Sequence, residues 1–328
     1  MIAVTITVDT EADHRGDAWV KSDPLAFRSV TDGVPKRLEP LLRSHGARAT
    51  YLLTTEVMAD PRSVEVLGRL TEAELGTHLH GDHVPPLARV PEPAGSTSWD
   101  FTCFYPHDVE RAKLQTITRQ YHEQFGKPPR SYRAGRYAAS GYTAQALVEL
   151  GYVVDTSVTP ALRWVNELDP SQVLDFVAAP LEPYRPSAAN LAQPGPLRIW
   201  ELPITIVPRP GWWNVGLTAA QVLAHRPQVT YPVWLRPSTT SWPWLRWIVG
   251  TRLAGAPGRS RLFNIMFHSM EVVEGASPYT PTRASAERVL RRLDRLLGFL
   301  RHVGARFVTA SELAGLLDGG AWERPAHA

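Results

Sequence analysis

The chain has 328 residues and a single cysteine, Cys103. One thiol excludes a disulfide within the chain and a zinc site built on several cysteines. We interpret Cys103 as an incidental thiol in a loop rather than a nucleophile. Hydrophobic residues make up 44% and charged residues 20%, which is ordinary for a globular protein. The chain is therefore expected to bury a large core without a crosslink or a structural metal.

The sequence also lacks membrane, export and nucleic-acid signals. No apolar run reaches the length of a membrane span. The chain begins MIAVTITVDTE, an alternating strand pattern without the basic segment and cleavage site of a signal peptide, so we expect a cytoplasmic protein. The net charge is only +3, and the one basic cluster fits the solvated face of a helix: Arg288, Arg291, Arg292 and Arg295. Nucleic acid is therefore not an expected partner.

Strand and helix patterns alternate along most of the chain. Strands are predicted over 2–8, 47–54, 76–80, 131–135, 152–157, 197–207, 261–269 and 305–309. Helices are predicted over 33–46, 61–70, 109–126, 142–150, 285–304 and 310–317. Such alternation predicts parallel pairing and an α/β fold, and the strand count with the chain length favours a (β/α) barrel, complete or incomplete.

Residues 158–260 interrupt this alternation. The segment is rich in Pro and Trp, and only 197–207 reads as a strand. Because linkers are poor in aromatic residues, we interpret the segment as an insertion packed over one face of the domain. The sequence thus predicts one domain over 1–318, with an insertion at about 158–260 and a frayed tail at 319–328.

Residues of catalytic type lie where the predicted strands end. They are Asp9, Glu11, His78, His80, Arg133, Asp155 and His268. In barrels of this kind the carboxyl ends of the strands form the face that carries the chemistry. We therefore expect these side chains to meet in one site. Taken singly, Arg133 also fits a surface ion pair, Asp155 the start of a turn, and His268 a histidine bonded to backbone.

Two carboxylates and three histidines suggest a metal. Asp9 and Glu11 lie two residues apart, so in extended chain both point the same way. One would then bind a cation while the other acts as a base, although capping of the next segment is an alternative. His78 and His80 have the same spacing, and His83 would return through the turn at Gly81.

Two of the three histidines are expected to bind the ion. His78 is the first choice, His80 the second and His83 the reserve. A set of two histidines and one carboxylate leaves coordination positions open, as in catalytic rather than structural sites.

Five segments occur in a familiar order: TVDTE, ELGTHLHGDH, YRAGRY, GYVVDTS and FHSME. In this order they resemble the motifs of the NodB-homology polysaccharide deacetylases, the family 4 carbohydrate esterases. The resemblance runs from about residue 2 to 157 and from 261 to 317. It implies a distorted (β/α) barrel of seven or eight strands. It also implies one divalent ion, usually zinc, and hydrolysis of an N-acetyl or related acyl amide on a sugar.

The resemblance also implies roles for single residues. Asp9 would be the general base and His268 the general acid that protonates the leaving amine. Arg133 would keep Asp9 ionised, and Asp155 would orient or charge His268.

The chain departs from the family at three places. Thr10 separates two acidic residues that are adjacent aspartates in the family, so Glu11 would serve as the carboxylate ligand. The family's four-residue histidine step meets Asp82 here. Gly135 and Arg136 stand where the family carries Pro and Tyr. Arg136 is retained, with Tyr137, as a candidate for substrate binding.

The substrate is open at this stage. Trp212 and Trp213 are our candidates for stacking on a sugar ring, although an extra apolar layer on the barrel would explain the tryptophans equally well. A small non-sugar amide is an alternative substrate. A metal-independent glycosidase using Asp9 and Glu201 is an alternative enzyme, and a non-catalytic carbohydrate-binding barrel is the alternative without chemistry.

Overall fold

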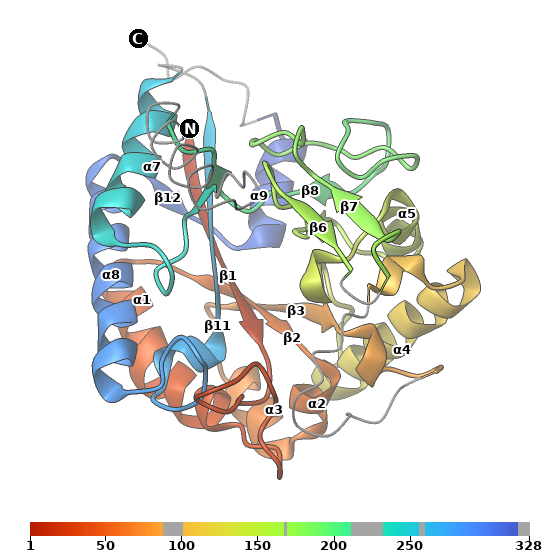
Figure 1. The fold of residues 1–328 in the computed structure, drawn as a ribbon, viewed down its shortest axis with the longest axis horizontal. Helices are drawn as coiled ribbons and strands as arrows, with labels where there is room; N and C mark the ends of the chain where they lie inside the picture. The colour runs from red at the N-terminus through yellow and green to blue at the C-terminus, as the bar shows by residue number, and fades with distance from the viewer. Residues whose placement is uncertain (88–100, 167–168, 211–231, 256–259, 321–328) are drawn as a thin grey trace, which may run out of the picture.

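We analysed a computed structural model that describes residues 1–87, 101–166, 169–210, 232–255 and 260–320 (Figure 1). Its centre is an eight-stranded sheet in the order β11-β1-β2-β3-β4-β5-β8, with β12 also paired to β1. All of these pairings are parallel. The strands are β1 (Ile2–Thr10), β2 (Ala49–Leu53), β3 (Glu74–Leu79), β4 (Ser131–Ala134), β5 (Val154–Asp155), β8 (Trp200–Glu201), β11 (Arg261–His268) and β12 (Arg306–Phe307).

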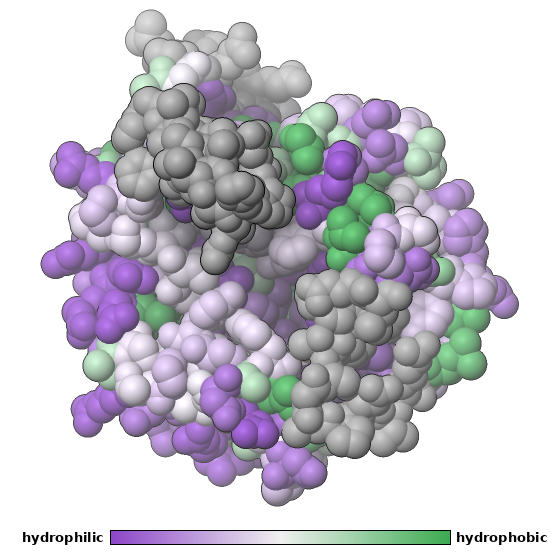
Figure 2. All heavy atoms as spheres, in the orientation of Figure 1, coloured by the Kyte–Doolittle hydropathy of each residue, from purple (hydrophilic) through white to green (hydrophobic). Residues whose placement is uncertain are grey.

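Helices surround the sheet (Figure 1). They are α1 (Glu39–Ser44), α2 (Thr55–Ala59), α3 (Pro61–Gly68), α4 (His107–Phe125), α5 (Gly141–Glu149), α7 (Trp242–Ala254), α8 (Arg283–His302) and α9 (Ala310–Asp318). Short turns of helix are η2 (Gly81–His83), η3 (Thr102–Phe104), η4 (Gly135–Tyr137) and η5 (Ser269–Val272), and the π-helix η1 (Ser29–Leu38) continues into α1. Figure 2 shows the left edge, where α8 lies, as mostly hydrophilic.

The sheet curls into a distorted barrel. Beyond β8, the Thr205 amide donates to the Asn264 carbonyl oxygen of β11 at 3.2 Å, and the Asn264 amide donates to Thr205 Oγ1 at 2.8 Å. These two bonds connect β11 with the segment that follows β8, where no strand ladder forms among the described residues. The predicted fold, a distorted barrel of seven or eight strands, is confirmed.

Strand register brings distant residues side by side. Asp9 of β1 is opposite His268 of β11, and His78 of β3 is opposite Arg133 of β4. Each of these residues lies in the last part of its strand. Because parallel strands end at the same edge of a sheet, the side chains gather at the carboxyl end of the barrel.

The strand predicted over 197–207 is wrong as a single element. Its start forms β8 in the barrel, while Ile206–Val207 forms β9, which pairs antiparallel with β10 (Val233–Trp234). Pro203 lies between them and has no N–H for a ladder, which explains the break. A second small ribbon pairs β6 (Arg163–Val165) with β7 (Val173–Asp175).

Two further predictions concern the rest of the chain. The insertion at about 158–260 and the domain limits stay predictions, and most of the 319–328 tail lies outside the described residues. Within the described residues, none of the helices is both long and apolar enough to span a membrane.

Candidate active site

Three donor atoms converge at the carboxyl end of the barrel. Glu11 follows β1, and His78 and His80 come from the end of β3. Their ligand atoms all lie within 4.8 Å of one another. Glu11 Oε1 is 3.4 Å from His78 Nε2 and 3.7 Å from His80 Nε2, and the two Nε2 atoms are 3.1 Å apart. Among the described residues this is the candidate metal site.

The donor triangle fits a divalent ion. Ligands bound to zinc at about 2.0–2.1 Å in tetrahedral geometry lie about 3.3 Å apart, close to the three separations here. The His78 Nδ1 atom lies 3.0 Å from the Arg133 carbonyl oxygen. Because a carbonyl oxygen can only accept, Nδ1 carries a proton, which leaves Nε2 as the atom that would bind an ion.

Gly135 is needed beside His80. A Cβ atom at position 135 would lie 2.7 Å from the Leu79 carbonyl oxygen and 2.9 Å from Cγ and Nδ1 of the His80 ring. A residue larger than glycine would displace that ring. The glycine at this departure from the family motif thus allows strand β4 to approach the histidine closely.

His83 lies outside the donor triangle. It is part of η2, and its Nε2 atom is 3.8 Å from Asp82 Oδ2. The turn is tied to α4 because Lys113 Nζ donates to the carbonyl oxygens of Gly81 and Val84, both at 2.6 Å. The geometry thus groups His80, rather than the reserve His83, with His78.

Asp9 is held on one side and open on the other. Arg133 is fully buried, and its Nη1 donates to Asp9 Oδ1 at 2.5 Å. The second oxygen, Oδ2, lies 3.8 Å from His78 Nε2 and 3.9 Å from His268 Nε2. Burial is the largest influence and acts to raise the pKa of Asp9. The Arg133 guanidinium and the neighbouring histidines together outweigh it, so the pKa lies below its ordinary value.

His268 faces the donor triangle from the opposite strand. Its Nε2 atom is 3.6 Å from Glu11 Oε1, while Nδ1 is 2.8 Å from Glu271 Oε1. Glu271 Oε1 also accepts from Arg236 Nη2, which lies 2.9 Å from His268 Nδ1. Two donors therefore share one carboxylate oxygen. Burial acts to raise the pKa of Glu271, but Arg236 and His268 hold the pKa at about 2.

Sequence reasoning missed both of these partners. Glu271 stands in the quoted FHSME segment, three residues after His268, so its spacing was available as a signal. Arg236 comes from the predicted insertion and carried no local signal.

Asp155 does not supply the partner of His268. It is the register partner of Glu201 on β8 and accepts from Ser157 Oγ at 2.5 Å. Burial raises the pKa of Asp155 to about 6 and that of Glu201 well above its ordinary value. A proton on Glu201 lets the two carboxyl groups hydrogen-bond to each other. In the described contacts of His268, the carboxylate at Nδ1 is Glu271 instead.

The remaining substrate candidates lie in two places. Arg136 and Tyr137 directly follow Gly135 and have positive φ angles of 55° and 59°. Such conformations cost about 1–3 kcal/mol each and cluster at functional sites. The Tyr137 ring packs 5.3 Å from the Trp164 ring. Trp212 and Trp213 lie outside the described residues.

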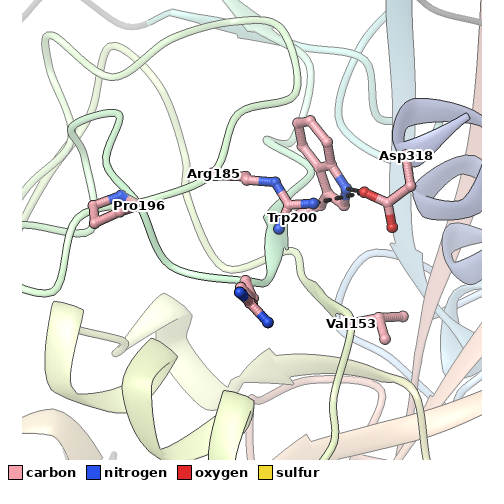
Figure 3. Close-up of a pocket in the computed structure, with 6 residues that line it drawn as sticks. Val153, Arg185, Pro196, Trp200 and Asp318 are labelled. Atoms are coloured by element: carbon pink, nitrogen blue, oxygen red, sulfur yellow. Dashed lines mark hydrogen bonds and ion pairs between the residues drawn. The ribbon is translucent and has the colours of Figure 1, made fainter. Parts of the chain in front are cut away.

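A hollow of about 430 Å³ lies at the amino ends of β5 and β8 (Figure 3). Its lining residues are Val153, Arg185, Pro196, Arg198, Trp200 and Asp318. Arg185 stacks over the Trp200 ring at 4.7 Å, and Asp318 Oδ1 accepts from Arg185 at 2.6 Å and from Trp200 Nε1 at 2.9 Å. The side chains of Arg185, Trp200 and Asp318 thus bond to one another, so we interpret this cluster as structural.

The fold and the site together define a (β/α) barrel with a candidate metal centre at the carboxyl ends of its strands. The same fold occurs in a structure described as a putative polysaccharide deacetylase from Mycobacterium smegmatis. That match has a TM-score of 0.52 and 13% identity, and it covers 100% of this chain and 93% of that chain. At this identity it establishes a shared fold, as the motif resemblance implied.

Two of the weaker structural matches have TM-scores below 0.5. One is a family 4 acetyl xylan esterase from Clostridium thermocellum, solved with cobalt, with a TM-score of 0.45, 12% identity and coverage of 96% and 91%. The other is the Xyl-CE4 domain of a xylanase from the hindgut metagenome of Trinervitermes trinervoides, with a TM-score of 0.43, 11% identity and coverage of 97% and 91%. No protein-family profile matches the chain, and no curated protein sequence matches it significantly.

Proposed function

We propose that this protein is a metal-dependent hydrolase that removes an acyl group, in the simplest case acetyl, from an amide nitrogen on a sugar or glycan precursor. One observation carries the proposal: an open carboxylate oxygen of Asp9 and the His268 imidazole border the same Glu11–His78–His80 donor set. A base, a metal site and an acid in one place are what amide hydrolysis needs.

Glu11 is the proposed carboxylate ligand, and Asp9 is the proposed base. Glu11 Oε1 belongs to the donor triangle, whereas Asp9 Oδ1 is engaged by Arg133. Asp9 Oδ2 then accepts the proton of the attacking water. The lowered pKa keeps this carboxylate ionised at neutral pH.

An ion held by Glu11, His78 and His80 would polarise the acyl carbonyl and lower the pKa of the attacking water. We propose zinc, because two imidazoles and one carboxylate with open positions are a typical catalytic zinc set.

His268 is the proposed acid at the leaving nitrogen. The ionised Glu271 accepts its Nδ1 proton and fixes the ring, so Nε2 faces the donor set and carries the proton to be delivered. Arg236 in turn keeps Glu271 charged. Donation of the Nε2 proton turns the nitrogen into an amine leaving group and completes the cleavage.

The sugar is the less constrained part of the proposal. It draws support from the motif order and from the M. smegmatis structure that shares the fold, which is described as a putative polysaccharide deacetylase. A small non-sugar amide would use the same residues. The glycosidase alternative would need Glu201 as its second carboxylate. Glu201 is fully buried and accepts a hydrogen bond from the Val158 amide, which disfavours this alternative.

The test is acetate release from N-acetylated chitooligosaccharides and from small N-acetyl amides, before and after metal removal. We expect release from the sugars, loss of activity with a chelator, and recovery with zinc. Asp9→Asn should lower kcat by about 10²–10⁴-fold while zinc stays bound. Release that survives complete metal removal, or an Asp9→Asn enzyme with normal rates, would contradict the proposal.

A further inference from the structure

A partly exposed tryptophan stands next to the proposed acid. Trp19 lies in the loop after β1 and is 40% exposed, and Tyr279, in the segment after η5, is 37% exposed. The Trp19 ring centroid lies 5.0 Å from that of Tyr279 and 5.6 Å from that of His268. Two aromatic side chains thus remain open to solvent beside the reacting groups.

The backbone holds this loop in place. His14 and Lys21 form an antiparallel bridge, and the Arg15 amide donates to the Val20 carbonyl oxygen at 2.8 Å. The His14 amide donates to the Ala276 carbonyl oxygen at 2.9 Å, which ties the loop to the segment that carries Tyr279. Trp19 is therefore positioned before any ligand arrives, which reduces the entropy cost of binding.

The position of Trp19 indicates which part of the substrate would lie against its ring. Its ring contacts His268, and His268 Nε2 is the atom proposed to protonate the leaving nitrogen. A group lying against Trp19 is therefore the one that carries the amine, not the acyl group. This step rests on the function proposed above.

The chemistry of the surroundings suits a sugar ring. A pyranose has an apolar face of C–H groups and a rim of hydroxyls, and aromatic rings with a polar border bind such a ligand well. Here the aromatic pair is bordered by Arg236, whose guanidinium lies 4.9 Å from the Tyr279 ring centroid. We propose that Trp19, supported by Tyr279, binds the apolar face of the amine-bearing sugar.

The experiment measures binding separately from catalysis. Calorimetry gives the dissociation constant of N-acetylchitotetraose for the zinc-supplied Asp9→Asn protein, with and without Trp19→Ala. The exposed part of the ring corresponds to about 60–100 Å². A sugar that covers this area would gain binding free energy from it. The Trp19→Ala variant should therefore bind the glycan about tenfold or more weakly. Trp19→Phe should restore most of that affinity, because the aromatic face is kept.

The matched control is Trp200→Phe, which alters a tryptophan at the opposite end of the strands. It should leave the affinity unchanged, and Tm and bound zinc should match between Trp19→Ala and its parent. A dissociation constant within twofold of the parent overturns the proposal, as does the absence of any glycan binding. Trp19-dependent binding without acetate release by the protein that retains Asp9 would refute the proposed hydrolase activity. The contact between Trp19 and the sugar would then stand, without its assignment to the amine-bearing sugar. Acetate release together with Trp19-independent binding would overturn the role of Trp19 and leave the proposed hydrolase activity standing.

Discussion

Replacing Gly135 by alanine tests whether the fold around His80 sets metal affinity. The added Cβ would lie 2.9 Å from two atoms of the His80 ring and 2.7 Å from the Leu79 carbonyl oxygen. Carbon atoms in ordinary contact lie about 3.5–4.0 Å apart, so the ring must move by about 0.5–1 Å. That displacement is large against a donor triangle with sides of 3.1, 3.4 and 3.7 Å.

The expected result has two parts. Forced overpacking of this kind costs about 1–3 kcal/mol of stability. Loss of support for a metal-binding histidine weakens metal affinity by about 10–100-fold. Competition with a chelator of known affinity gives the zinc dissociation constant, and thermal unfolding of the metal-free protein gives the stability change.

Gly250 provides the matched control. It lies inside α7, and a Cβ there meets nothing within 4 Å. Gly250→Ala should leave zinc affinity unchanged and add about 0.5–1 kcal/mol of stability, because glycine weakens a helix interior. A Gly135→Ala protein that binds zinc as tightly as the wild type would refute the role given to this close contact.

Two further predictions concern buried carboxyl groups. Glu271→Gln removes the charge that orients His268, so kcat should fall by about 10²–10⁴-fold with bound zinc unchanged, and a rate within threefold of wild type would be inconsistent with that role. The Asp155–Glu201 pair should destabilise the protein as pH rises, because the unfolded acids lose protons above about pH 4 while the raised pKa values keep a proton in the folded pair. The rise in the pKa of Asp155 from 3.8 to about 6 corresponds to about 3 kcal/mol. Glu201→Gln should therefore gain stability relative to wild type between pH 4 and pH 7 in urea unfolding, and an equal difference at both pH values would rule out the shared proton.

The sequence predicted much of this site because strand ends are easy to locate. Asp9, His78, Arg133 and His268 each lie near the end of a strand, and parallel pairing then places Asp9 opposite His268. That step requires only the alternation of strands and helices and the geometry of a parallel sheet.

Apart from Glu271, the features that were missed depend on contacts between distant segments. Arg236 reaches Glu271 across 35 residues, and no local pattern reports such a contact. Asp155 ends a strand, as the other candidates do, yet the neighbouring strand β8 supplies Glu201 rather than His268. The order of strands in the sheet decided that pairing.

The most direct test of the account is metal analysis of the purified protein and three histidine variants. We predict one divalent ion per chain in the wild type, with zinc bound when it is supplied. His78→Ala and His80→Ala should each lose the ion, while His83→Ala should keep it, since His83 lies outside the donor triangle. A wild-type protein that binds no divalent ion under metal-replete conditions, or a His83→Ala protein that loses the ion as His80→Ala does, would contradict the Glu11–His78–His80 site.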